Sequence, residues 1–260
     1  MKKFILLISV VLILSGCDYS NEESHNDFFY RTFVAPMDAT LHYISQYLNN
    51  SYGLAIILLV IIMRIIFLPF MLISVKNMYF NSEKKKRLKP ELIKIDNKMK
   101  SADSFKEMIK LKKEKHKLYK LHQISYAKNA FTFISIILQL PIIIGLFFAL
   151  KYPHYSENLS HTQFLWFSLK EPDFYIALLA GFFKFTQTLS SLLTESKQER
   201  QSKQFTLLLT PTIYIWWGMI FPSAIGLYWI VNSAFLTIQI YIAYIVYLKK
   251  AKREVSRSIS

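Results

Sequence analysis

Long apolar runs alternate with basic, polar segments along most of this chain. Five of the runs hold about 17 to 25 residues, which is long enough for a helix to cross the roughly 30 Å hydrocarbon layer of a bilayer. These expected spans cover residues 54–75, 131–150, 174–193, 205–221 and 224–248. Uninterrupted apolar runs of this length predict an all-α polytopic membrane protein.

The first apolar run differs from the other five. It follows two lysines, covers only residues 4–14 and is too short to span a bilayer, as in a signal peptide. It ends in the sequence LSGC, which resembles the cleavage box of bacterial lipoproteins. We therefore predict that residues 1–16 are a lipoprotein signal peptide and that Cys17 carries lipid, including palmitate. The alternative interpretation of Cys17 is a buried, inert thiol.

The mature N-terminal segment, residues 17–52, contains one stretch with helical periodicity. Its apolar positions recur at helical spacing and are Met37, Leu41, Ile44 and Leu48. This pattern predicts an amphipathic helix over residues 36–50. Beside a lipid anchor, such a helix is expected to lie in the membrane interface on the outer side. The alternative is a short helix of the protein core.

The segment between the first two spans, residues 77–128, is rich in lysine but keeps helical periodicity. Leu88, Leu92, Ile95 and Met99 form one apolar stripe, and Phe105, Met108 and Ile109 begin a second. The sequence KSADS lies between the stripes and offers Asp103 or Ser104 as a helix cap. We predict a helical hairpin over residues 83–122, similar to a short antiparallel coiled coil.

Charge then orients the predicted spans. The 260 residues are 53% hydrophobic with a net charge of +15. Residues 76–130 hold 17 Lys and Arg against 6 Asp and Glu, and residues 194–204 and 249–260 are also basic. Residues 18–53 and 152–173 contain one basic residue each. Short basic loops stay in the cytoplasm, so the N-terminus is expected outside and the basic tail, 249–260, inside.

The charge of the hairpin has more than one interpretation. A solvated helix surface and the orientation signal are sufficient to explain it. Attraction to anionic lipid headgroups or to ribosomal RNA is an additional interpretation. Because Tyr119 is the only aromatic residue interleaved with the lysines of the second helix beyond its start, specific nucleic-acid recognition is not expected.

Arg64 is the position where the apolar pattern breaks. It lies near the middle of the first span, where a charge costs roughly 2.5–3.5 kcal/mol on insertion scales. Either end of that helix is about 16 Å away at 1.5 Å per residue, which is beyond the reach of the side chain. None of the five spans contains Asp or Glu. Arg64 is therefore expected to face water inside the helix bundle.

The other polar residues of the spans are candidates to line this hydrated cavity: Gln139, Lys184, Gln187 and Asn232. Lys184 could instead reach a membrane interface if the third span is shifted. Gln139 and Gln187 could instead form hydrogen bonds between helices. A positive cavity without carboxylates suits anions or the acidic parts of a polypeptide, and does not suit proton-coupled transport.

The sequence lacks the residues that metal binding, phosphate binding and hydrolytic catalysis require. The six histidines lie outside the expected spans without metal-ligand spacing. There is no glycine-rich phosphate loop and no set of Ser, His and Asp that can be placed on one side of the membrane. We expect no cofactor and no enzymatic activity. A small anion channel or transporter that uses Arg64 and Lys184 is the alternative to the function given next.

Four stretches together resemble the YidC-type insertases of the YidC/Oxa/Alb superfamily, in the Gram-positive branch with a lipoprotein start. They are "YGLAIILLVIIMRIIFLPF", "QLPIIIGLFFALKY", "FLWFSLKEPDFYIALLAGFF" and "FPSAIGLYWIVNSAFLTIQ", and the likeness covers residues 33–248 in order. The resemblance implies five transmembrane helices around a hydrophilic groove open to the cytoplasm and lipid. The groove arginine of the family corresponds to Arg64, and Trp229 joins the expected groove residues.

The resemblance also implies how the chain is divided into segments and where the protein acts. The first span, 53–76, precedes the cytoplasmic hairpin, and residues 129–248 form the remaining four spans. The protein is expected in the bacterial plasma membrane, where it inserts and helps fold other membrane proteins. Implied partners are nascent membrane proteins and membrane lipids, and the Sec translocon and the ribosome are further candidates.

Overall fold

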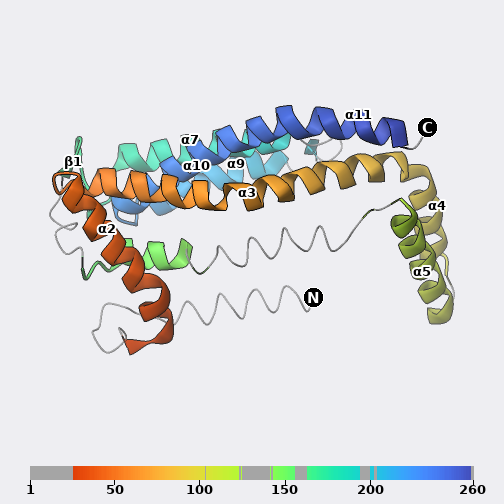
Figure 1. Ribbon diagram of the computed structural model, residues 1–260, viewed down its shortest axis with the longest axis horizontal. Coiled ribbons are helices and arrows are strands. Elements are labelled where there is room, and N and C mark those ends of the chain that lie inside the picture. Colours follow the sequence, from red (N-terminus) through yellow and green to blue (C-terminus); the bar gives the residue numbers. More distant parts are fainter. Residues whose placement is uncertain are drawn as a thin grey trace. The chain divides into compact units, whose positions relative to one another are not determined.

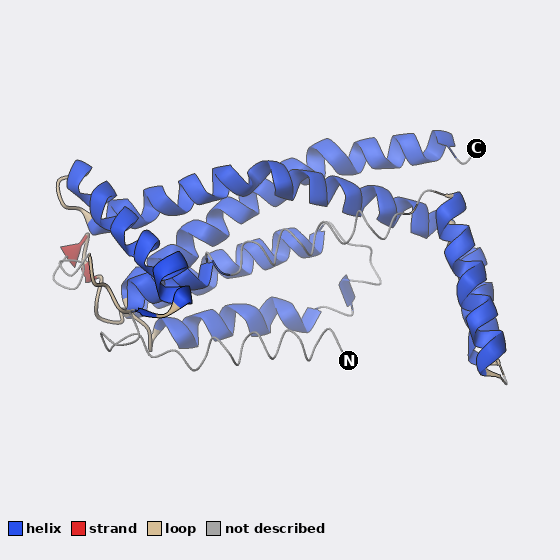
Figure 2. Cartoon of the chain, turned by 60° about the horizontal axis from the view of Figure 1, so that its bottom comes forward, coloured by secondary structure: helices blue, strands red, loops and turns tan. Residues whose placement is uncertain are grey.

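Almost all of the chain that the computed structural model describes is helical (Figures 1 and 2). The described residues are 26–102, 104–122, 124, 141, 143–155, 163–193, 200–201 and 204–258. The chain divides into two compact units. The first contains residues 1–64 and 138–237, and the second contains residues 65–137 and 238–260.

The first unit is built mainly from helices. Its elements are the π-helical turn η2 (Tyr30–Val34), α2 (Ala35–Tyr47), the first part of α3 (Tyr52–Arg87), a helix over 143–151, the strands β1 (Gln163–Phe164) and β2 (Phe167–Ser168), α7 (Phe174–Leu193), α9 (Gln204–Gly218) and most of α10 (Ser223–Ala243). The two strands pair antiparallel, with Phe164 opposite Phe167. They form a small hairpin immediately before α7.

Local chemistry explains where two of these helices begin. The Asp173 carboxylate accepts a hydrogen bond of 2.9 Å from the backbone N–H of Ile176, which caps the first turn of α7. At the start of α10, the backbone N–H and the hydroxyl of Ser223 both donate to the Glu171 carbonyl, at 3.1 and 2.7 Å. These bonds fix the α9–α10 turn against the segment that precedes α7.

Small residues allow the helices of the first unit to approach closely. A Cβ atom added at Gly218 would lie 2.9 Å from the Cα of Ala177, and one at Gly226 would lie 2.6 Å from Cγ2 of Ile176. Gly181 on α7 likewise lies against Ile215 of α9. Helices in membranes associate through such close van der Waals packing because lipid supplies no hydrophobic driving force between them.

The predicted amphipathic helix is confirmed as α2. Leu41 is fully buried, and Met37 and Ile44 pack against the main apolar core of the first unit. Tyr43 and Tyr47 are exposed. The apolar stripe is thus covered by protein, as the interpretation as a core helix requires, while the position in the membrane interface stays a prediction.

The second unit contains the predicted helical hairpin. Its elements are the rest of α3, α4 (Lys89–Lys100), α5 (Phe105–Leu121), the end of α10, the π-helical turn η4 (Tyr244–Leu248) and α11 (Lys249–Ser258). α4 and α5 pack against each other, and Lys115 pairs with Asp96 at 2.5 Å. The Ser104 hydroxyl accepts from the Glu107 N–H at 3.1 Å, which confirms Ser104 as the cap of α5.

One boundary of the hairpin differs from the prediction. Residues 83–87, expected to begin the hairpin, continue α3 instead, and the turn lies at Leu88. The helix also passes through Pro69 without ending. A basic run of good helix formers follows the span, and lysine and arginine stabilise a helix near its C-terminus.

The expected spans correspond to helices in the described residues, except that the fourth ends at Gly218 and residues 219–221 form a turn. α7 covers residues 174–193, α9 covers 204–218, and α10 with η4 covers 223–248. Most of the expected span 131–150 lies outside the described residues. Among the described helices, two are long and apolar enough to cross a membrane by length and composition, Tyr52–Arg87 and Ser223–Ser256. The helical class is confirmed, and the number of spans stays a prediction.

Candidate functional site

Arg64 lies on the inward face of α3. Only 6% of its surface is exposed, and Val60, one turn earlier, is also buried. Ile62, on the opposite side of the helix, is exposed. Arg64 therefore lies on the buried stripe that α3 also presents to the apolar core. The water predicted around its guanidinium group stays a prediction.

The guanidinium group of Arg64 is held by an amide. Its Nε–H donates to the side-chain oxygen of Asn232 on α10 at 2.7 Å, and its Nη2 group donates to the same oxygen. Hydrogen bonds from a charged donor are worth more than those between neutral groups. The amide oxygen of Asn232 has no formal charge, so these two donor groups of Arg64 have a neutral partner on α10.

Lys184 lies on α7 with partners from within the same unit. Its ammonium group donates to the Gln187 side-chain oxygen at 3.1 Å and lies 4.8 Å from the centre of the Tyr214 ring. An ammonium group this close to an aromatic face gains cation–π attraction. The structure thus joins two predicted groove residues, Lys184 and Gln187, in one cluster.

A cluster of aromatic rings adjoins Lys184. Trp229 of α10 is buried, and its ring centre lies 5.0 Å from that of Tyr214 on α9. The rings of Trp217 and Phe221 lie 6.4 and 6.3 Å from Trp229. These distances show that Trp229 packs among three other aromatic rings. It lies three residues before Asn232 on α10.

Of the seven predicted site residues, the structure brings five into one unit and leaves two undescribed. Arg64 contacts Asn232, and Lys184 contacts Gln187. Trp229 touches the ring of Tyr214, over which Lys184 lies. Gln139 and Cys17 lie outside the described residues.

Sequence reasoning missed Tyr214 and a pair of threonines. Tyr214 contacts both Lys184 and Trp229. Thr188 and Thr210 join α7 to α9 through a hydrogen bond of 3.1 Å between their hydroxyl groups. The available signal was the position of Tyr214 and Thr210 inside an apolar run, where a hydroxyl group requires a partner.

A buried carboxylate outside the expected spans was also missed. Asp38 of α2 is 1% exposed, and its side chain accepts hydrogen bonds from the backbone N–H groups of His154 and Tyr155, at 2.6 and 2.7 Å. Burial, together with the charge of Asp38, raises the pKa of Tyr30 to about 12. This carboxylate fixes α2 to the chain that follows the helix 143–151.

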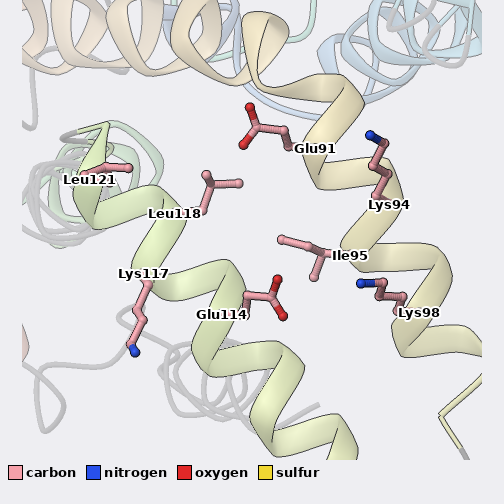
Figure 3. Close-up of a pocket in the computed structure, with 8 residues that line it drawn as sticks. All are labelled: Glu91, Lys94, Ile95, Lys98, Glu114, Lys117, Leu118 and Leu121. Atoms are coloured by element: carbon pink, nitrogen blue, oxygen red, sulfur yellow. The ribbon is translucent and has the colours of Figure 1, made fainter.

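A separate hollow of about 460 Å³ lies in the hairpin between α4 and α5. In Figure 3, Ile95 and Leu118 point into the space between the two helices, whereas Lys117 points away from it. Apolar and charged side chains of both signs share its lining, which comprises Glu91, Lys94, Ile95, Lys98, Glu114, Lys117, Leu118 and Leu121. Within the described residues, no three His, Cys, Asp or Glu side chains gather closely enough to hold a metal ion.

Comparison with known proteins gives the family of the chain. The family model described as "60Kd inner membrane protein" matches residues 43–251. A Staphylococcus carnosus protein named membrane protein insertase YidC is 38% identical over 98% of this chain and 88% of its own length. Proteins of the same name from Staphylococcus haemolyticus and Staphylococcus aureus are 39% and 40% identical, over 98% and 96% of this chain and 88% and 87% of their own lengths.

Proposed function

The chain belongs to the 60Kd inner membrane protein family, and from this premise we infer that it is a membrane protein insertase. It acts on nascent membrane proteins and delivers them into the lipid bilayer without forming or breaking a covalent bond. The near full-length likeness to proteins named membrane protein insertase supports this function over an anion channel.

We propose that the substrate meets the protein at Arg64. The observation that carries this proposal is that a buried arginine is held by the neutral amide of Asn232. The positive charge of this guanidinium group can attract an acidic or polar segment of a substrate. Two unit charges 4 Å apart attract by about 4 kcal/mol at the effective dielectric constant of 20 typical near a protein surface.

The proposed groove is open to the cytoplasm and to lipid. Arg64, Lys184, Gln187 and Asn232 supply its polar side, and Gln139 is included from the sequence alone. The exported polar segment of the substrate enters this groove, while its apolar helix stays against lipid. Transfer of the apolar helix from water to lipid along this side supplies the free energy, because it buries apolar surface.

The proposed topology has five spans in the bacterial plasma membrane. Long apolar segments supply the spans, and the basic segments 76–130, 194–204 and 249–260 are assigned to the cytoplasm. A lipidated Cys17 at the outer surface agrees with that orientation. The cytoplasmic hairpin is then available to nascent chains, and the Sec translocon and the ribosome are further proposed partners.

Insertion by reconstituted protein tests the role of Arg64. Two single-span substrates that differ only in an acidic or neutral exported segment are offered to vesicles containing the parent chain, Arg64→Ala or Arg64→Lys. We expect Arg64→Ala to reduce insertion of the acidic substrate most, and Arg64→Lys to retain much of it, because charge matters more than fork geometry in a hydrated groove. Ser233→Ala, on the same helix as Asn232, is the matched control.

Two results would contradict the proposal. Equal insertion of both substrates by the parent chain and Arg64→Ala would show that the arginine does not receive the substrate. Passage of small anions without substrate insertion would support a channel instead.

A further inference from the structure

The turn of the β1–β2 hairpin presents two bulky apolar side chains to the surroundings. Leu165 and Trp166 form the two-residue turn, and 74% and 56% of their surfaces are exposed. Two-residue hairpin turns in water usually carry glycine, asparagine or aspartate. A turn made of leucine and tryptophan is therefore unusual for a loop that faces water.

The backbone conformation at Leu165 is also unusual for a leucine. Leu165 has a φ of 57°, in the left-handed region that bulky side chains rarely adopt. The other non-glycine residues with positive φ in the described chain are Asn49 and Asn50, and asparagine tolerates this conformation. At residue 165 the chain instead keeps a large apolar side chain in a strained conformation.

The hairpin is attached firmly to the first unit. Phe167 and Leu169 are buried in its apolar core. The Phe164 ring lies directly over Gly53 of α3, where a Cβ atom would overlap it. Because the base of the hairpin is fixed, the exposed turn has a defined position at the end of α7.

Other exposed aromatic side chains gather at the same end. Phe174 and Tyr175 are exposed on the first turn of α7, and Trp216 and Trp217 are exposed near the end of α9. The two helix ends adjoin, since Gly218 lies against the backbone of Ala177. Tryptophan and tyrosine concentrate where a membrane protein meets the headgroup region of the bilayer.

We propose that the Leu165–Trp166 turn is a membrane anchor that inserts into the lipid interface beside the N-terminal end of α7. Residues 163–169 contain no charged side chain, whereas Lys170 and Glu171 follow at once. An uncharged apolar tip with charged residues behind it fits the boundary between acyl chains and headgroups. The contact fixes the depth of this end of the helix bundle, and it does not depend on insertase activity.

Tryptophan fluorescence can test the anchor in the full chain. The protein is reconstituted into vesicles whose lipids are brominated near the glycerol end of the acyl chains, with iodide on both sides of the membrane in a parallel sample. The difference between the parent chain and Trp166→Phe isolates the emission of Trp166. The same difference for Trp229→Phe supplies the reference for a ring enclosed by protein.

We expect brominated lipid to quench Trp166 several-fold more strongly than Trp229, and iodide to have little effect on Trp166. Quenching by iodide and not by lipid would place the turn in water and overturn the proposal. Resistance to both quenchers, as for Trp229, would mean that another protein surface covers the turn, which would also overturn it. Leu165→Asp, by adding a charge to the tip, should weaken lipid quenching of Trp166.

Discussion

The contact between Arg64 and Asn232 predicts a specific loss of stability. Asn232→Ala removes the oxygen that accepts from both Nε and Nη2 of Arg64. A hydrogen bond to a charged group contributes about 1.5–3 kcal/mol. Since both donors use one oxygen, their contributions do not add, and the other interactions of Arg64 favour the lower half of this range. For a chain of this size, the loss corresponds to a decrease in Tm of roughly 3–9 °C.

The control for this measurement lies one residue further along α10. Ser233 is 1% exposed, and its hydroxyl has no hydrogen-bond partner in the described part of the chain. Ser233→Ala therefore removes a buried polar atom without breaking a bond of that kind, and we expect stability to be unchanged or increased. Thermal unfolding of both variants and the parent chain in the same detergent gives the comparison.

Asn232→Asp separates stability from function. A carboxylate at this position would pair with Arg64, so we expect stability to be retained or increased. Pairing would also neutralise the charge proposed to receive the substrate, so insertion of an acidic exported segment should fall while that of a neutral segment is less affected. Equal melting of Asn232→Ala and Ser233→Ala, or full insertion of acidic substrates by Asn232→Asp, would refute the reasoning.

Three further predictions concern other parts of the chain. The purified protein should begin at a lipid-modified Cys17, and an intact mass with the signal peptide retained or the Cys17 thiol free would disprove this. The free energy of unfolding should fall between about pH 10 and 12, because the Tyr30 hydroxyl has a pKa of about 12 in the folded state and near 10 in the unfolded state. Thermal unfolding of Tyr30→Phe across this pH range should show a smaller fall. An unchanged fall would contradict the assignment. Ser104→Ala should destabilise the hairpin by about 1 kcal/mol through loss of the α5 cap, and circular dichroism that shows no lower melting temperature would contradict it.

The helices and the inward direction of Arg64 could be predicted because each depends on local pattern. Apolar run length gave the position of α7, and the spacing of Ser104 before a helical stripe gave the cap of α5. Because the expected spans contain no carboxylate, the sequence predicted that Arg64 points into the helix bundle. These inferences need only the composition of a segment and the period of a helix.

Contacts between distant segments could not be predicted in the same way. Asn232 lies 168 residues from Arg64, and nothing in either segment selects that amide over Gln139 or Gln187. Asp38 accepts from backbone groups 116 and 117 residues away, and backbone donors have no sequence signature. Such partners depend on how helices meet in space, which a single sequence does not reveal.

The glycine contacts of α7 restrict the route by which a client helix could leave. Gly181 and Gly218 bring α7 and α9 together at two levels, and Gly226 brings α10 against α7. Seams this tight have no room for a passing side chain, and parting them would break close packing along the whole contact. A client that has reached Arg64 must therefore exit along a side of the bundle that these seams do not close.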